Sequence, residues 1–253
     1  MKELFFPLTM IVISTLATPA FAKDKLPTNA VNAIEQTLTK YYGNQYQNDC
    51  LFFSHDETHY CAKVTNAEIK TLNGKSQLYV LVNGDYAEPG LDAGHVTEGI
   101  GGLFIFNQVN NQWQLAATQP YITNGAYGSS QLGNFKLVQI APDKFGWYGE
   151  YGYTSTGCTE VNKHIYAQVG NQIKAIFMAD PLDSDCSGNG DGWDSYESKL
   201  TILSQKSASN GFYPIQINAI EHDYPDNHNV KKGKVKKSNY QMTYKPSAQK
   251  YIR

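Results

Sequence analysis

The chain has 253 residues and a formal net charge of −2, from 21 basic and 23 acidic residues. This balance argues against a nucleic-acid partner, because proteins that bind phosphate backbones usually carry an excess of lysine and arginine. Only 17% of the residues are charged, and the apolar residues come in short runs between glycine-containing turns. Such a composition predicts an all-β protein.

The first residues have the pattern of a cleavable secretory signal peptide, residues 1–22. Lys2 precedes an apolar run over residues 4–16, and Pro19 is followed by a small-residue triplet that ends at Ala22. Cleavage is expected after Ala22, which leaves residues 23–253 as a single β-rich domain. The apolar run is shorter than the ~20 residues that a bilayer span needs, so no membrane span is expected after cleavage. The expected location is periplasmic or secreted.

The four cysteines predict two disulfides, because disulfides form in the oxidising compartments that exported proteins enter. The sequence alone allows three pairings. Closeness along the chain favours Cys50–Cys61 and Cys158–Cys186, since short loops close often during folding. A structural zinc site is the alternative, but no two cysteines have the C-x-x-C spacing that is typical of one.

One helix is expected near the start of the mature chain, over residues 27–42. Its apolar residues fall on one stripe at helical spacing: Val31, Ile34, Leu38 and Tyr41. The stripe predicts that the helix packs on a sheet, and the chain that follows it has the pattern of short strands.

The strand-rich part contains an internal repeat. Residues 105–112 (IFNQVNNQ) match residues 165–172 (IYAQVGNQ) at an offset of 60. The repeat predicts tandem four-stranded antiparallel β-meander units, at approximately 64–118, 135–178 and 199–253. The expected fold class is therefore all-β with one N-terminal helix, its units forming an open stack or a sandwich-like arrangement. A propeller-like closure is the second choice, because propellers normally begin at four blades.

The sequence carries no motif that identifies an enzyme. The G-x-S-x-G nucleophile elbow, the H-E-x-x-H zinc motif, the phosphate loop and the dinucleotide fingerprint are all missing. His55 and His59 are four residues apart, a spacing that could hold zinc on a helix. Their place inside the expected Cys50–Cys61 loop instead favours a stapled hairpin with a polar tip. No catalytic residue is therefore assigned.

An aspartate- and glycine-rich segment, residues 183–194, resembles a calcium loop of the EF-hand type. It departs from that pattern because an aspartate replaces the bidentate glutamate, a cysteine lies inside the loop and no helix flanks it. A glycine-rich surface loop is the alternative. The segment predicts at most weak calcium binding, and no other cofactor is expected. The oxygen donors would be Asp183, Asp185, Asp191 and Asp194.

A cluster of aromatic residues is a first candidate for contact with a partner. Alternate residues of a strand point to the same face of a sheet. An exposed aromatic face could stack on sugar rings or anchor a protein, whereas core packing is the alternative. The residues that would share this face are Phe145, Trp147, Tyr151 and Tyr153.

The lysine-rich C-terminal part is a second candidate, since no acidic residue follows Asp226. Such a run could bind an anionic envelope polymer or an acidic protein surface. A solvated hairpin is the alternative. The lysines concerned are Lys231, Lys232, Lys234, Lys236 and Lys237.

These patterns predict an exported, non-enzymatic β-repeat binding module that engages a protein or glycan partner in the bacterial envelope. The alternatives are an envelope hydrolase with an unrecognised site and a structural envelope component. A hydrolase should show acidic residues or histidines that converge in a cleft, whereas a binding protein should show a broad exposed aromatic or charged face.

Overall fold

The computed structural model describes residues 26–253 apart from 48, 156–157, 187–192 and 225–232. The predicted signal peptide therefore lies outside the described residues. The described chain is mostly strand with one helix, and its sheets are antiparallel in nearly every pairing and do not close on themselves. The predicted strand-rich fold with one N-terminal helix is confirmed. Within the described residues, no helix is long and apolar enough to cross a membrane.

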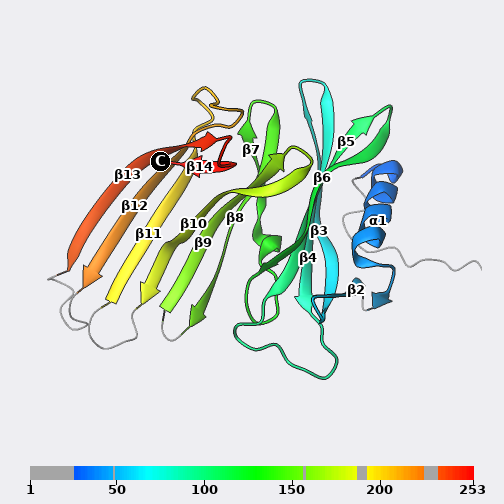
Figure 1. Cartoon of the computed structure of the whole chain (residues 1–253), viewed down its shortest axis with the longest axis horizontal. Helices are drawn as coiled ribbons and strands as arrows, with labels where there is room; N and C mark the ends of the chain where they lie inside the picture. Colours follow the sequence, from blue (N-terminus) through cyan, green and yellow to red (C-terminus); the bar gives the residue numbers. More distant parts are fainter. Residues whose placement is uncertain (1–25, 48, 156–157, 187–192, 225–232) are drawn as a thin grey trace, which may run out of the picture.

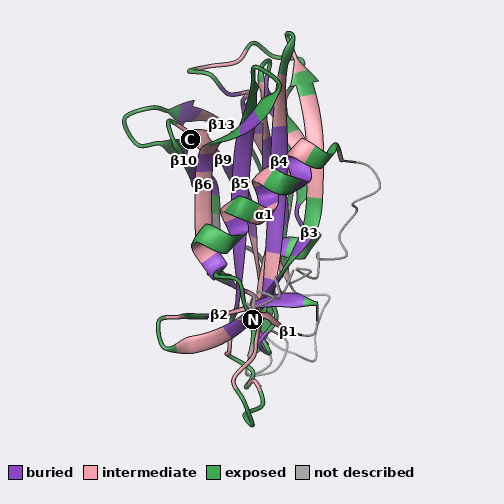
Figure 2. Ribbon diagram, turned by 90° about the vertical axis from the view of Figure 1, so that its right-hand side faces the viewer, coloured by how far each residue is buried: buried purple, intermediate pink, exposed green. Residues whose placement is uncertain are grey.

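The helix α1, Thr28–Tyr42, lies across one face of the first sheet (Figure 2). Val31, Ile34 and Leu38 are buried, as their helical spacing predicts. Tyr42 is also buried, and its hydroxyl donates to the backbone carbonyl oxygen of Pro120 in the sheet at 2.6 Å. These contacts hold the helix against the sheet.

The first sheet is formed by strands that follow one another along the chain, each antiparallel to the next. Strand β5, between β4 and β6, is buried on both faces over most of its length, so its apolar residues form an unbroken run. Phe104 and Phe106 belong to the core beneath α1, whereas Leu103 and Ile105 belong to the core on the other side. The strands are β1 (Tyr46–Gln47), β2 (Cys50–His55), β3 (Thr58–Leu72), β4 (Lys75–Tyr86), β5 (Gly99–Val109) and β6 (Gln112–Asn124).

The second sheet continues in the same antiparallel manner after a short 3-10 helix, η2 (Leu132–Asn134). Among the described residues it joins the first sheet through one parallel pair, Thr118 of β6 and Gln172 of β10. The strands beyond this junction fan out on the far side of the molecule from α1 (Figure 1). They are β7 (Lys136–Ala141), β8 (Lys144–Ser155), β9 (Cys158–Val169), β10 (Gln172–Cys186), β11 (Trp193–Ile202), β12 (Ile215–Tyr224), β13 (Lys234–Lys245) and β14 (Lys250–Ile252).

A core between the two sheets fixes how they meet. Leu81, Leu103 and Ile105 of the first sheet pack with Trp147 and Tyr166 of the second. A separate core lies within the second sheet, where β14 folds back toward β10. The protein thus has three layers here: α1, the first sheet, and the β8–β10 part of the second sheet. The ends of strands from both sheets border the cleft described below.

The two matched segments of the predicted repeat occupy corresponding hairpins. β5 ends at Val109 and β6 begins at Gln112, while β9 ends at Val169 and β10 begins at Gln172. Both boundaries keep the offset of 60 seen in the sequence. A tandem repeat of whole four-stranded units would also require the units to superpose on one another. The repeat of whole units therefore stays a prediction.

Candidate binding cleft

A cleft of about 570 Å³ opens where the ends of the two sheets meet. It is bordered by the β3–β4 turn, the end of β5, the β7–β8 turn and the end of β9. Concave sites that combine apolar and polar groups are the usual places for ligands. Its lining combines five amides (Asn73, Gln77, Asn107, Gln108, Gln168), three lysines (Lys70, Lys75, Lys144), Asp143, two aromatic residues (Tyr79, Phe145), and Leu72, Ser76 and Val109.

Tyr79, buried in the wall of the cleft, is part of a directed chain of hydrogen bonds. The backbone N–H of Phe145 donates to the Tyr79 hydroxyl oxygen at 3.4 Å. The Tyr79 hydroxyl donates to Oε1 of Gln77 at 2.6 Å, and Nε2 of Gln77 donates to Oδ1 of Asn107 at 2.9 Å. The hydrogen bonds thus run from Phe145 through Tyr79 and Gln77 to Asn107. Asn107 thus accepts through its oxygen, and its amide hydrogens have no partner among the described residues.

The ionisation of Tyr79 does not disturb this chain at physiological pH. The pKa of Tyr79 is raised to about 12, chiefly by burial; the hydrogen bond from the Phe145 backbone lowers it and the negative charge of Asp143 raises it. The hydroxyl therefore keeps its proton and continues to donate to Gln77.

Lys70 lies at the edge of the cleft beside both a carboxylate and an aromatic ring. Its ammonium nitrogen is 2.6 Å from Oε2 of Glu68 and 5.6 Å from the centre of the Phe145 ring. A cation over a ring face is attracted by the ring quadrupole. The two contacts give the Lys70 side chain a defined position, in which it covers part of the Phe145 ring.

The other two lysines are less restrained. The Lys144 ammonium lies 5.2 Å from the centre of the Phe212 ring. In the described part of the chain, neither Lys75 nor Lys144 has a carboxylate within ion-pair distance. The charge of the exposed Lys75 is therefore accessible to a ligand, whereas the Lys144 ammonium lies over Phe212, which does not line the cleft.

The four aromatic residues predicted to share one face have different surroundings in the structure. Phe145 lines the cleft, while Trp147, only 2% exposed, and the half-buried Tyr151 pack in the core between the sheets. Tyr153 is 45% exposed. For Trp147, the expected exposed face is core instead, because the first sheet covers it.

The lysine-rich segment is partly described. Lys234, Lys236 and Lys237 are exposed on the strand β13, which pairs antiparallel with β12, an arrangement that agrees with a solvated hairpin. The Lys236 ammonium is 3.0 Å from a carboxylate oxygen of Glu221 on β12. Lys231 and Lys232 lie outside the described residues.

The predicted calcium donors lie outside the described side chains. The segment 187–192, which contains Asp191, is not described, and of Asp183, Asp185 and Asp194 only the backbone is, in β10 and β11. Among the residues that the structure describes, no group of three or more His, Cys, Asp or Glu side chains could hold a metal ion. Calcium binding stays a prediction.

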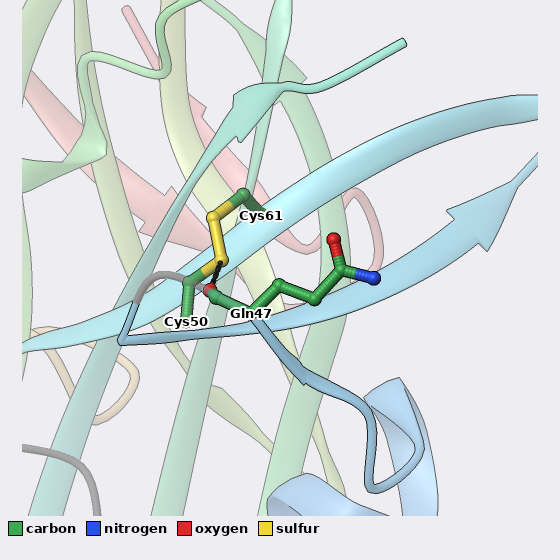
Figure 3. Close-up of a disulfide and its surroundings, with 3 residues drawn as sticks. All are labelled: Gln47, Cys50 and Cys61. Atoms are coloured by element: carbon green, nitrogen blue, oxygen red, sulfur yellow. Dashed lines mark hydrogen bonds between the residues drawn. A yellow bond between two sulfur atoms is a disulfide. The ribbon is translucent and has the colours of Figure 1, made fainter. Parts of the chain in front are cut away.

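The Cys50–Cys61 disulfide is present, as the sequence predicts, and ties β2 to β3 (Figure 3). Figure 3 also shows the Cys50 sulfur facing the carbonyl oxygen of Gln47, 3.0 Å away. Inside the loop, β2 and β3 form the expected hairpin. Its two turn residues, Asp56 and Glu57, have positive φ angles, as two-residue hairpin turns require.

The two histidines of this hairpin do not converge on one point. The His55 ring stacks on Tyr121 at 4.1 Å between centroids, whereas Nδ1 of His59 lies 2.9 Å from a carboxylate oxygen of Glu88. Their side chains are thus engaged separately, which agrees with a stapled hairpin and not with a shared zinc ion.

The second predicted disulfide is described in part. Cys158 is disulfide-bonded, and the register of β9 and β10 places it directly opposite Cys186. The Cys186 side chain lies outside the described side chains, so the pairing Cys158–Cys186 stays a prediction.

A buried histidine lies in the core beyond the cleft. His164 of β9 is 1% exposed, and its ring stacks on Tyr151 at 4.2 Å between centroids and lies 5.9 Å from Tyr166. Neither ring nitrogen has a hydrogen-bond partner among the described residues. Burial lowers the pKa of His164 to about 4. The ring is therefore neutral at physiological pH.

Most of the cleft is not evident from the sequence. Gln77 and Asn107 lie in different strands and meet Phe145 only after the two sheets pack together. One signal does exist, because Gln108 and Gln168 occupy equivalent positions in the two matched segments and both line the cleft.

Comparisons with protein-family models, with curated proteins and with solved structures found no match to this chain. The function of the cleft is therefore argued from its own residues.

Proposed function

We propose that the protein is an exported binding module of the bacterial envelope and that its cleft holds a glycan without converting it. The observation that carries this proposal is the set of five amide side chains in the cleft lining. An amide group has both donors and an acceptor, so together these side chains can satisfy sugar hydroxyl groups, which also donate and accept. The half-buried ring of Phe145 adds an apolar surface for a sugar face.

The composition of the cleft supports binding better than hydrolysis. Most glycosidases use a pair of carboxyl groups that flank the scissile bond. Among the described residues, Asp143 is the one carboxylate in the cleft lining, and no histidine lines it. The pair of groups that general acid and base catalysis requires is therefore not brought together there.

The proposed location outside the cytoplasm rests on two features. The N-terminal residues have the pattern of a cleavable signal, and the Cys50–Cys61 disulfide is of the kind that persists in oxidising compartments. Both features support a periplasmic or secreted protein.

The proposed tandem repeat gives the cleft an origin. Gln108 of the first unit and Gln168 of the second are equivalent in the matched segments, and each contributes to the same lining. A duplicated β-meander that packs against its copy would thus place two equivalent strand ends beside one another, with a ligand held between them.

The proposal is tested by titrating the exported chain with oligosaccharides of the bacterial envelope in a calorimeter. We expect Gln168→Trp to weaken binding by at least about tenfold, because an indole would occupy the cleft. Gln36→Trp is the matched control, since Gln36 is an exposed residue of α1 on the opposite face of the first sheet. Binding that survives Gln168→Trp, or no binding by the unaltered chain, would contradict the proposal.

A further inference from the structure

Resting on the proposed glycan-binding role, we infer that the cleft recognises an acidic glycan, whose sugars carry carboxylate or phosphate groups. The inference depends on the direction of the hydrogen bonds in the cleft and on the charges that surround it.

The hydrogen-bond chain leaves the NH₂ group of Asn107 without a partner among the described residues. The Phe145 N–H donates to Tyr79, the Tyr79 hydroxyl donates to the oxygen of Gln77, and the Gln77 nitrogen donates to the oxygen of Asn107. The oxygen atoms of both amides thus each accept one hydrogen bond inside the protein. What faces a ligand from Asn107 is its NH₂ group, which can only donate.

The charged groups of the cleft add more donors. Lys70, Lys75 and Lys144 are cations, against the single carboxylate of Asp143 in the lining. With Glu68, which pairs with Lys70 from outside the lining, three positive and two negative charges leave a net charge of +1. Ammonium groups have three donors each and no acceptor.

The Asn107 NH₂ group and the lysines favour a ligand that brings acceptors, while the oxygens of Gln108 and Gln168, whose nitrogens donate within the protein, can accept from its hydroxyl groups. A neutral sugar hydroxyl can accept from these groups, but hydrogen bonds from a cation to a carboxylate or phosphate oxygen are roughly twice as strong as neutral ones. Lys75 and Lys144 have no ion-pair partner in the described part of the chain, so an anionic group would displace no internal carboxylate from them. The cleft therefore selects an acidic sugar over its neutral counterpart.

The test compares probes that differ only in charge. The full exported chain is titrated with oligogalacturonate and with its methyl ester, and in parallel with phosphorylated and unphosphorylated mannose oligosaccharides. We expect each acidic probe to bind more tightly than its neutral partner, by about tenfold for two charge-assisted hydrogen bonds. The two acidic probes separate recognition of a carboxylate from recognition of a phosphate.

Variants then localise the effect to the cleft. Lys75→Gln and Lys144→Gln should each weaken binding of the acidic probe by about two- to fivefold, as expected for an exposed charge pair, and leave the neutral probe unchanged. Lys63→Gln is the control, because Lys63 is exposed on β3 and does not line the cleft. Affinity for the acidic probe should also fall as salt rises.

Two results would overturn the inference, and they differ in meaning. Equal affinity for acidic and neutral probes, with no loss in either lysine variant, would refute the acidic glycan and leave the glycan-binding cleft in place. If no probe binds, both the acidic glycan and the glycan-binding cleft are refuted. Equal melting temperatures of the variants and the unaltered chain would show that a loss of binding in a variant is not due to unfolding.

Discussion

Acidification should destabilise this protein through His164. The ring is buried between Tyr151 and Tyr166, without a hydrogen-bond partner among the described residues, and burial lowers its pKa to about 4. An unfolded histidine has a pKa of about 6.5. Below that value the unfolded chain binds more protons than the folded one, so stability is full above pH 6.5 and falls as the pH decreases.

The size of this effect follows from the two pKa values. A difference of about 2.5 units at 1.36 kcal/mol per unit corresponds to a loss of roughly 3 kcal/mol once the pH is below 4. At pH 5 the loss is about 2 kcal/mol, because the folded ring is still largely neutral there while the unfolded one is charged. This is a large part of the 5–15 kcal/mol that is typical of a folded domain.

The assay is chemical denaturation of the unaltered chain and of His164→Phe at several pH values between 4 and 7.5. Other groups also contribute to acid unfolding, Glu88 among them, since hydrogen bonds from His59 lower the pKa of its carboxyl. The difference between the two proteins isolates His164, and His95→Gln on an exposed loop is the control. The reasoning fails if His164→Phe keeps the full pH dependence of the unaltered chain.

Three further predictions concern the core, the hairpin and the aspartate-rich segment. Trp147→Ala should cost about 3–5 kcal/mol of folding free energy by leaving a cavity. Tyr153→Ala, at an exposed residue, should cost less than about 1 kcal/mol. Equal losses of stability for the two variants on thermal denaturation would exclude Trp147 from the core. Replacing both Cys50 and Cys61 by alanine should cost roughly 3 kcal/mol by the chain-entropy relation for a loop of this length, a sequence separation of 11; an unchanged denaturation midpoint would contradict it. If residues 183–194 bind calcium, the ion should raise the melting temperature relative to a chelator, and identical melting curves would remove that hypothesis.

Local patterns were sufficient to predict the strand-rich class, the helix and the first hairpin. The stripe of Val31, Ile34 and Leu38 identifies the helix because its burial follows from spacing within one segment. The hairpin closed by Cys50–Cys61 is likewise a local structure, because its two cysteines have a sequence separation of only 11.

The burial of the aromatic residues could not be predicted in the same way. Alternation shows that Phe145 and Trp147 share a face, but both a core and an exposed surface produce that pattern. Whether such a face is core or exposed surface depends on whether another layer covers the strand. Here the first sheet covers Trp147, whereas Phe145 lies at the edge of this core and lines the cleft.

The cleft depends on contacts between segments that are distant in sequence. Gln77 and Asn107 belong to neighbouring strands, and the β7–β8 turn with Phe145 reaches them from the second sheet. Each residue alone resembles an ordinary polar residue of a strand end. Only the packing of the sheets, fixed by large side chains such as Trp147 and Tyr166, brings their polar groups to one place.

The central claim, that the cleft holds an acidic glycan, is tested most directly by the side-chain amide signals in NMR. The isotope-labelled chain is titrated with oligogalacturonate, and the NH₂ resonances of Asn107, Gln77 and Gln168 are assigned by single substitutions. The account predicts that the Asn107 resonances shift most and saturate together with the calorimetric binding curve. Shifts confined to the lysine-bearing strand β13, or no shift at Asn107 while the ligand binds, would place the ligand elsewhere and contradict the account.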